Sequence, residues 1–213
     1  MPGAGETASR ARWAAVIVAA GESRRMGRLK PLLPFGEHTV IEQAVAVARD
    51  SDLSPLVVVL GHEAERIGAH LPADARPAFN ADYREGGMFS SVCRGIREVL
   101  GTAAGVVLFV GDNVTLTPEV VVSLRSAWET EGRPRDRFYI PTFEGSWGHP
   151  VVITADLLPM VLEWCGERGL RGVMEAHTGQ ITEVPVLESG IGLDIDTPED
   201  YARALAWLEA RQG

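Results

Sequence analysis

The chain has 213 residues, a formal net charge of −9, 46% hydrophobic residues and 23% charged residues. This composition is typical of a folded globular protein and excludes disordered and fibrous classes. The acidic balance argues against nucleic acid as a partner, because non-specific binding needs a broad basic face to replace phosphate counterions. A negative net charge is still compatible with one local cationic pocket.

Cysteine use and hydropathy favour a cytoplasmic protein. Cys93 and Cys165 lie far apart and fit neither a disulfide framework nor a zinc site, as expected in a reducing compartment. The apolar run Trp13–Ala20 is too short to span a membrane, so no membrane association is expected. Residues 1–11 are expected to form a disordered tail, and residues 12–213 a single domain.

Apolar runs and helical patterns alternate along the chain. Continuous β-branched runs with turn signals after them predict strands buried on both faces: Ala15–Ala19, Leu56–Leu60 and Val106–Val110. Helical patterns follow them: Val40–Asp50, His62–His70 and Ser90–Leu100. This order predicts an α/β fold, a single-domain doubly wound, mostly parallel sheet whose site lies at the carboxyl ends of the strands.

The second half of the chain is less regular. Thr117-Pro118 and Thr197-Pro198 each predict a helix start, with threonine as the N-cap and proline at the first helical position. The second of these helices is expected to run to about Arg211. Between Phe138 and Val186 the alternation of apolar runs and helical patterns is less regular and predicts short strands, including one near Gln180–Val186. Such a region often contains substrate-specific insertions.

The segment after the first predicted strand, Ala19–Lys30, reads AAGESRRMGRLK. Glycines let backbone N–H groups approach a phosphate, and three arginines and one lysine add cations on a short arc. The spacing is neither that of a Walker A loop nor that of GxGxxG, which also disfavours a nicotinamide-dependent dehydrogenase. We interpret the segment as a phosphate-binding loop; the alternative is a solvated basic loop.

This loop resembles the signature of nucleotidyltransferases that act in molybdenum-cofactor maturation. The similarity is greater to molybdopterin cytidylyltransferases than to molybdopterin-guanine dinucleotide synthases. It continues in order along nearly the whole chain: Leu32–Gly36, Gly61–Glu63, Asn80–Tyr83, Gly87–Gly95, Gly111-Asp112, Gly148–Pro150, Gly166–Gly169 and Asp194–Asp200. The resemblance implies a GT-A-like, Rossmann-like fold and in-line transfer of a nucleotide, expected to be CMP from CTP, to a molybdopterin-type phosphate with release of pyrophosphate.

The resemblance also implies roles for individual residues. Arg24, Lys30 and Asp112 are the expected catalytic residues. Nucleotide contacts are expected from Ala19, Ala20, Gly21, Glu22, Ser23, Arg24, Lys30, Ser90, Ser91 and Asp112. Acceptor contacts are expected from Gly148, His149 and Arg168. Arg25 and Arg28 are expected to point towards solvent, and the alternative role for the two serines is to cap a helix.

Three carboxylates are candidates for a metal site. Asp112 follows the third predicted strand, and Asp194 and Asp196 would point to one face if their segment were a strand. Carboxylates combined with substrate phosphates are the usual ligands of Mg²⁺, the expected cofactor. The alternative for Gly111-Asp112 is an ordinary turn.

The sequence departs from the family pattern at two positions. Asn113-Val114 stands where relatives have a polar or small residue and then proline, and Leu29 stands where relatives have proline. Asn113-Val114 is the one feature that favours a non-catalytic, nucleotide- or cofactor-binding member. A sugar- or alditol-phosphate nucleotidyltransferase of the same fold is the alternative enzyme. A molybdoenzyme or its chaperone is the candidate protein partner.

Overall fold

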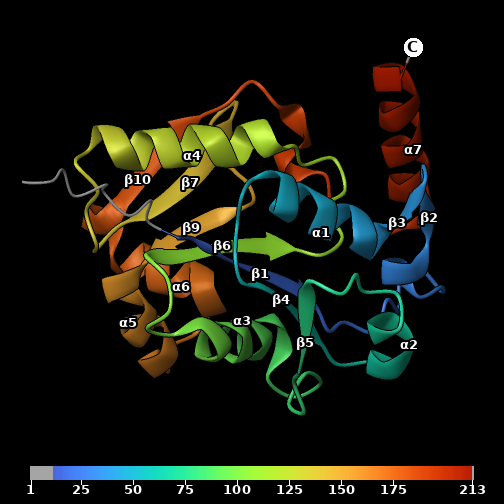
Figure 1. Ribbon diagram of the computed structural model, residues 1–213, viewed down its shortest axis with the longest axis horizontal. Coiled ribbons are helices and arrows are strands. Elements are labelled where there is room, and N and C mark those ends of the chain that lie inside the picture. Colours follow the sequence, from blue (N-terminus) through green and yellow to red (C-terminus); the bar gives the residue numbers. More distant parts are fainter. Residues whose placement is uncertain (1–11, 213) are drawn as a thin grey trace, which may run out of the picture.

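The computed structural model describes residues 12–212, so the predicted tail, residues 1–11, lies outside the described residues. The central sheet has the strand order β5-β4-β1-β6-β9-β7-β10 (Figure 1). Strand β8 pairs with β7 outside this order. The strands are β1 Ala14–Ala19, β4 Leu56–Leu60, β5 Ala75–Phe79, β6 Gly105–Val110, β7 Phe138–Phe143, β8 Ser146–Trp147, β9 Val151–Thr154 and β10 Ile181–Pro185. Strands β4, β5 and β6 join β1 in one parallel set, and β9 runs antiparallel to its neighbours β6 and β7. The predicted α/β fold with a mostly parallel sheet is confirmed.

Helices cover both faces of the sheet, which explains the continuous apolar strands (Figure 1). One face packs against α1 Val40–Asp50 and α4 Pro118–Thr130. The other packs against α3 Gly87–Val99, α5 Leu158–Glu163 and α6 Gly169–Ala176. Alternate residues of β1 enter the two cores: Ile17 belongs to the first and Val16 to the second, and both are fully buried.

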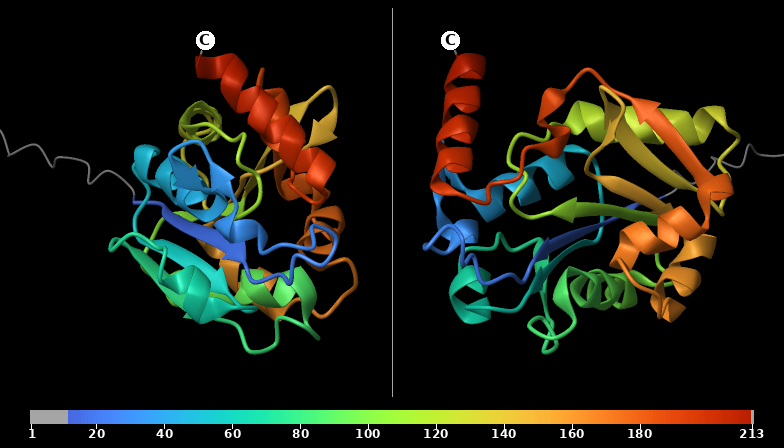
Figure 2. Two further views of the ribbon diagram at one scale, coloured as in Figure 1. Left: turned by 90° about the vertical axis from the view of Figure 1, so that its right-hand side faces the viewer. Right: turned by 180° about the vertical axis from the view of Figure 1, so that it is seen from behind.

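The terminal helix α7, Pro198–Gln212, lies beside a small hairpin at one side of the molecule (Figure 2). The hairpin consists of β2 Pro34–Phe35 and β3 His38–Thr39. A third apolar cluster joins them and includes Phe35, Ile195 and Ala204. Thr197 caps α7 as predicted, since its hydroxyl accepts a hydrogen bond from the Asp200 N–H at 3.2 Å. Helix α4 also begins at its predicted proline, without a capping bond from Thr117.

Several predicted boundaries are wrong for local reasons. Helix α2 covers only Ala64–Gly68 and not the predicted His62–His70; it begins after Glu63, whose backbone is left-handed with φ of 51°. Helix α3 begins at Gly87, so Ser90 lies inside its first turn and is not an N-cap. Strand β5 was not predicted, because this edge strand reads ARPAF and has no continuous apolar run. Residues 193–196 form no strand, so the expectation that Asp194 and Asp196 share a strand face is wrong. Short 3₁₀ turns occur at Lys30–Leu32, Ala155–Leu157, Thr178–Gln180 and Ser189–Gly192.

Gly95 gives a test of the packing between α3 and the sheet. A Cβ atom at this position would lie 2.3 Å from Val16 Cγ1 and 2.9 Å from Val59 Cγ2. Gly95→Ala should therefore lower the free energy of unfolding by about 1–3 kcal/mol through overpacking, although alanine favours helix. Urea denaturation measures the change. Gly179→Ala is the control, because nothing lies within 4 Å of its added methyl. Equal stability of the two variants would contradict this packing.

Candidate active site

The loop after β1 has a shape fixed by backbone contacts. At the ends of the neighbouring strands, a Cβ atom on Gly61 would lie 2.8 Å from the Ala20 carbonyl oxygen, so only glycine lets the chains approach. Further along, the Lys30 N–H donates to Ser23 Oγ at 3.1 Å, and the Gly27 N–H donates to the Ser23 carbonyl at 3.2 Å. Ser23 thus closes the loop and brings Lys30 back towards the sheet.

The loop forms one wall of a cavity of about 370 Å³, and the ends of β1 and β6 and the start of α3 form the others. Most predicted nucleotide-binding residues line it: Ala19, Ala20, Gly21, Ser23, Arg24, Lys30, Ser91 and Asp112. Glu22 lies outside this cavity and pairs with Arg24 and Arg84 on the rim of a shallow neighbouring pocket. Ser90 is not among the residues that line the cavity. The loop and the strand end therefore meet, as the sequence predicted.

Lys30 connects the loop with two carboxylates. Its Nζ lies 2.5 Å from Asp112 Oδ2 and 3.1 Å from Asp196 Oδ1, and 16% of its side chain is exposed. Burial would lower the pKa of Lys30, but Asp112 and Asp196 outweigh it and raise the pKa above its ordinary value. Lys30 is therefore a fixed cation at the centre of the site.

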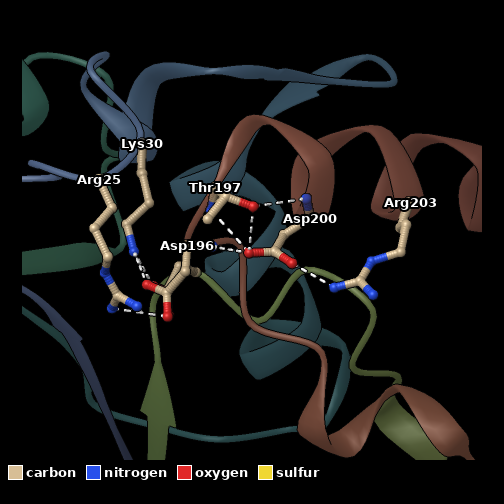
Figure 3. A network of polar contacts seen from close by, with 7 residues as sticks. Arg25, Lys30, Asp196, Thr197, Asp200 and Arg203 are labelled. Carbon is tan, nitrogen blue, oxygen red and sulfur yellow. Dashed lines mark hydrogen bonds and ion pairs between the residues drawn. The ribbon is translucent and has the colours of Figure 1, made fainter.

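Asp196 is held in place by the start of α7 (Figure 3). The Asp200 carboxylate accepts hydrogen bonds from the N–H groups of Asp196 at 3.1 Å and Thr197 at 2.8 Å. Hydrogen bonds from the Thr197 hydroxyl and these N–H groups lower the pKa of Asp200 to about 2. Arg25 is largely exposed, as expected, yet its guanidinium lies 2.8 Å from Asp196 Oδ2. Arg25 therefore belongs to the site, which the sequence did not indicate.

Two buried carboxylate oxygens have unused lone pairs. Within the described part of the chain, Asp112 Oδ1 and Asp194 Oδ1 have no hydrogen-bond partner. Burial, helped by the charges of Asp112 and Asp196, raises the pKa of Asp194 to about 6. No group of three or more His, Cys, Asp or Glu residues that could hold a metal occurs in residues 12–212. Asp112 lines the first cavity and Asp194 does not. Their carboxylate oxygens are the type of ligand that a hard divalent cation takes together with phosphates and water.

Asn113 ties the carboxylate segments together, a role that sequence reasoning missed. Its buried Nδ2 donates to the Ile191 carbonyl at 3.1 Å, while the Ile195 N–H donates to the Asp112 carbonyl at 3.2 Å. Val114 is 1% exposed and packs in the third apolar cluster. The departure Asn113-Val114 thus has a structural role and does not disrupt the site.

A second cavity, of about 270 Å³, adjoins the first and shares Val18, Met88 and Val110 with it. The predicted acceptor residues Gly148, His149 and Arg168 all line it. Most of its other lining side chains are apolar: Phe89, Val92, Leu108, Phe109, Ile140, Trp147, Val151, Leu170 and Met174. Arg168 is largely exposed and pairs with Glu175, which also binds Arg171 at 3.1 Å. The second cavity is therefore apolar inside, with two guanidinium groups among its lining residues.

His149 contributes a neutral imidazole to this cavity. The backbone N–H of His149 donates to the Ile191 carbonyl at 3.0 Å. The ring Nδ1 is buried and has no hydrogen-bond partner among the described residues. Burial lowers the pKa of His149 to about 4, opposed in part by the charge of Asp112. The ring is therefore uncharged at neutral pH and suits hydrogen bonding better than charge pairing.

These features define the class of the protein. The basic, glycine-containing loop after β1, the Asp112 carboxylate at the end of β6 and this sheet order are typical of a nucleotidyltransferase. The model of the MobA-like NTP transferase domain matches residues 15–181, and the chain belongs to this family.

Relatives within the family have different names. Purine catabolism protein PucB of Bacillus subtilis (strain 168) is 30% identical over 200 residues, which is 87% of this chain and 92% of that protein. Molybdenum cofactor cytidylyltransferase of Escherichia coli (strain K12) is 26% identical over 191 residues, 89% and 93% of the two chains. Nicotine blue oxidoreductase of Paenarthrobacter nicotinovorans is 29% identical over 202 residues, 89% and 95%. Membership of the family therefore does not by itself select a substrate.

Solved structures share the fold. The Rv0371c homologue of Mycobacterium sp. strain JC1 superposes with a TM-score of 0.81 at 29% identity, covering 96% of this chain and 100% of that one. Rv0371c of Mycobacterium tuberculosis H37Rv in complex with manganese gives a TM-score of 0.71 at 25% identity, covering 92% and 98%. The second structure is a manganese complex of a protein with this fold.

Two further observations bear on the sequence predictions. Cys93 is buried and Cys165 is exposed, and both are free, as predicted. None of the helices within residues 12–212 is long and apolar enough to cross a membrane.

The burial of His149 predicts a pH dependence of stability. The unfolded chain binds a proton near pH 6.5 and the folded chain only near pH 4, so stability is lost as the pH falls between these values. At about pH 5 this should cost the protein about 2 kcal/mol, and His149→Asn should remove that part of the pH dependence. Urea denaturation at about pH 7.5 and about pH 5 measures it.

The matched control is His70→Asn, because His70 is exposed. The raised pKa of Asp194 makes the folded state more stable as the pH falls, which is opposite to the effect of His149. This contribution is the same in the wild type and in both variants, so the difference between them reports His149 alone. An identical pH dependence in wild type and His149→Asn would contradict the buried, neutral imidazole.

Proposed function

We propose that the protein transfers CMP from CTP to the phosphate of a molybdopterin-type acceptor and releases pyrophosphate. The nucleotide occupies the first cavity, the acceptor occupies the second, and a divalent cation, expected to be Mg²⁺, binds with the nucleotide. The free cysteines support a cytoplasmic location for this reaction. A molybdoenzyme or its chaperone is the expected recipient of the product.

The observation on which the proposal rests is the junction of two chemically different cavities. One contains the cations and Asp112, and the other is apolar with arginines among its lining residues. The shared residues Val18, Met88 and Val110 make them adjacent. A donor and an acceptor bound in this way meet near the end of β6, and such positioning alone can supply several kcal/mol towards the transition state.

The proposed step is an in-line displacement at phosphorus. An oxygen of the acceptor phosphate attacks the α-phosphorus of CTP, and the bond from that phosphorus to the bridging oxygen breaks, so the electron pair leaves with pyrophosphate. Lys30 and Arg24, with Arg25 nearby, neutralise the negative charge that develops on the leaving group. Asp112 and Asp194 would hold the divalent cation, which would supply further charge neutralisation at the phosphate oxygens.

The lining of the second cavity favours a flat heterocyclic acceptor over a sugar or alditol phosphate. Sugar hydroxyls require hydrogen-bond partners when they are buried, and most of this lining is apolar. A heterocycle can lie against the apolar side chains and present its phosphate to Arg168. The 26% identical cytidylyltransferase from Escherichia coli supports the same choice.

Pyrophosphate release tests the proposed function. The purified protein with Mg²⁺ is assayed with each of the four nucleoside triphosphates and molybdopterin, and CTP should give the fastest turnover. Lys30→Ala should reduce the rate by about 10²–10³, the scale for losing one charge-stabilising donor. Arg28→Ala is the matched control, because Arg28 is exposed, and should change the rate little.

Other outcomes select the alternatives. Faster turnover with a sugar or alditol phosphate would favour the second enzyme class. Binding of a nucleoside triphosphate without any pyrophosphate release would favour a non-catalytic member of the family.

Arg168 tests the acceptor side separately. If its guanidinium leaves Glu175 to bind the acceptor phosphate, Arg168→Ala should raise KM for molybdopterin about tenfold and leave the affinity for CTP unchanged. Arg168→Lys should restore only part of the loss, because lysine lacks the bidentate fork. Steady-state kinetics with each substrate varied in turn gives both values. Weaker CTP binding with an unchanged KM for molybdopterin would mean that the two cavities have been assigned in reverse.

A further inference from the structure

Glu22, Arg24 and Arg84 form a group of ion pairs beside the first cavity, and the proposed reaction uses only Arg24 of the three. Glu22 Oε2 lies 2.5 Å from Arg24 Nη2, and Arg84 Nε donates a hydrogen bond to Glu22 Oε1 at 2.9 Å. The Glu22 side chain is 19% exposed, whereas that of Arg24 is 82% exposed. Because each carboxylate oxygen binds a different arginine, Arg24 can leave Glu22 without breaking the contact with Arg84.

Arg84 has a support of its own on the far side of the shallow pocket. Its guanidinium carbon lies 5.3 Å from the centroid of the Tyr83 ring, within the range of a cation–π contact. The Tyr83 ring packs against Gly61, where an added Cβ atom would lie 2.6 Å from Tyr83 Cγ. These contacts keep Arg84 beside Glu22 independently of Arg24.

Arg24 lies where it can exchange one anion for another. It lines both the first cavity and the shallow pocket, which is formed by Gly21–Arg24 with Tyr83 and Arg84. Glu22 and Arg84 line the shallow pocket and not the first cavity. A triphosphate in the first cavity carries several negative charges and attracts the Arg24 guanidinium more strongly than one carboxylate does. Glu22 and the triphosphate are therefore competitors for the same cation.

We propose that Glu22 competes with the polyphosphate part of the nucleotide for Arg24 and that Arg84 limits this competition. Glu22 and Arg84 are then positioning residues, which set how tightly the site holds triphosphate and pyrophosphate without touching either. This inference rests on the proposed function, because it needs a triphosphate in the first cavity. It also replaces the expectation that Glu22 contacts the nucleotide.

The two positioning residues act with opposite signs. The Glu22 carboxylate opposes phosphate binding in two ways, because it holds Arg24 and because it repels the phosphates. Arg84 pairs with the same carboxylate and so reduces both effects. Loss of the Glu22 charge should therefore strengthen polyphosphate binding, and loss of the Arg84 charge should weaken it. A residue that contacted the phosphates directly through a metal or a water would instead weaken binding when removed.

Charge-neutral variants test the proposal by calorimetric titration of CTP and of inorganic tripolyphosphate, with Mg²⁺ and about 0.05 M NaCl. Glu22→Gln should bind both ligands about three- to fivefold more tightly, the scale of one ion pair at a protein surface. Arg84→Gln should bind both about three- to fivefold more weakly, and Arg84→Lys should retain most of the affinity because it keeps the charge. At about 0.5 M NaCl the differences should fall below about twofold.

The double variant separates a role through Glu22 from a general effect of charge. Once Glu22→Gln is in place, Arg84→Gln should change either affinity by less than about 1.5-fold, because no carboxylate remains to compensate. Arg135→Gln is the matched control, since Arg135 pairs with the exposed Asp156 and lines none of the three cavities. It should leave both affinities within about 1.5-fold.

Unchanged or weaker binding by Glu22→Gln would overturn the proposal. Equal losses on Arg84→Gln in the presence and absence of the Glu22 carboxylate would overturn the role of Arg84.

The proposed function fails on a different result. Wild-type protein that binds none of the four nucleoside triphosphates would overturn both. Wild-type protein that binds CTP, with Glu22→Gln binding it equally well, would overturn only this inference. Tighter binding by Glu22→Gln in a protein that releases no pyrophosphate would overturn the proposed reaction and leave this inference standing.

Discussion

The ion cluster of Lys30 with Asp112 and Asp196 is the interaction on which the site depends. It joins three segments far apart in sequence: the loop after β1, the end of β6 and the start of α7. Each of the three side chains is at least partly buried, so removing one leaves a charge with reduced solvation and fewer partners. The same cluster keeps a cation beside the carboxylates in the absence of a nucleotide.

The position of this cluster depends on contacts that are not themselves charged. Asn113 binds the Ile191 carbonyl, and Asp200 binds the N–H groups at the start of α7, so both carboxylate segments are fixed by hydrogen bonds before any ligand arrives. Such pre-organisation matters because a transition state gains most from groups that need no rearrangement. It also explains why Asn113 is compatible with an intact site.

The sequence predicted the central strands, because β1, β4 and β6 are buried on both faces and therefore read as continuous apolar runs. It could not predict β5, whose edge position tolerates Arg76 and Pro77. The loop and Asp112 were predicted to lie together because both follow parallel strands. The roles of Arg25 and Asn113 were not predictable, since each depends on a partner distant in sequence.

The antiparallel strand β9 explains why the two cavities lie at the same edge of the sheet. In the register of β6 and β9, Leu108 pairs with Val151, so Gly148–Pro150, which precede β9, lie at the carboxyl end of β6. If β9 ran parallel to β6, the residues that precede β9 would lie at the opposite edge of the sheet, beside the start of β6. In the neighbouring pair, Val18 of β1 is opposite Val110 of β6, and these two side chains line both cavities. One reversal of strand direction therefore places the segment that lines the second cavity beside the strand end that lines the first.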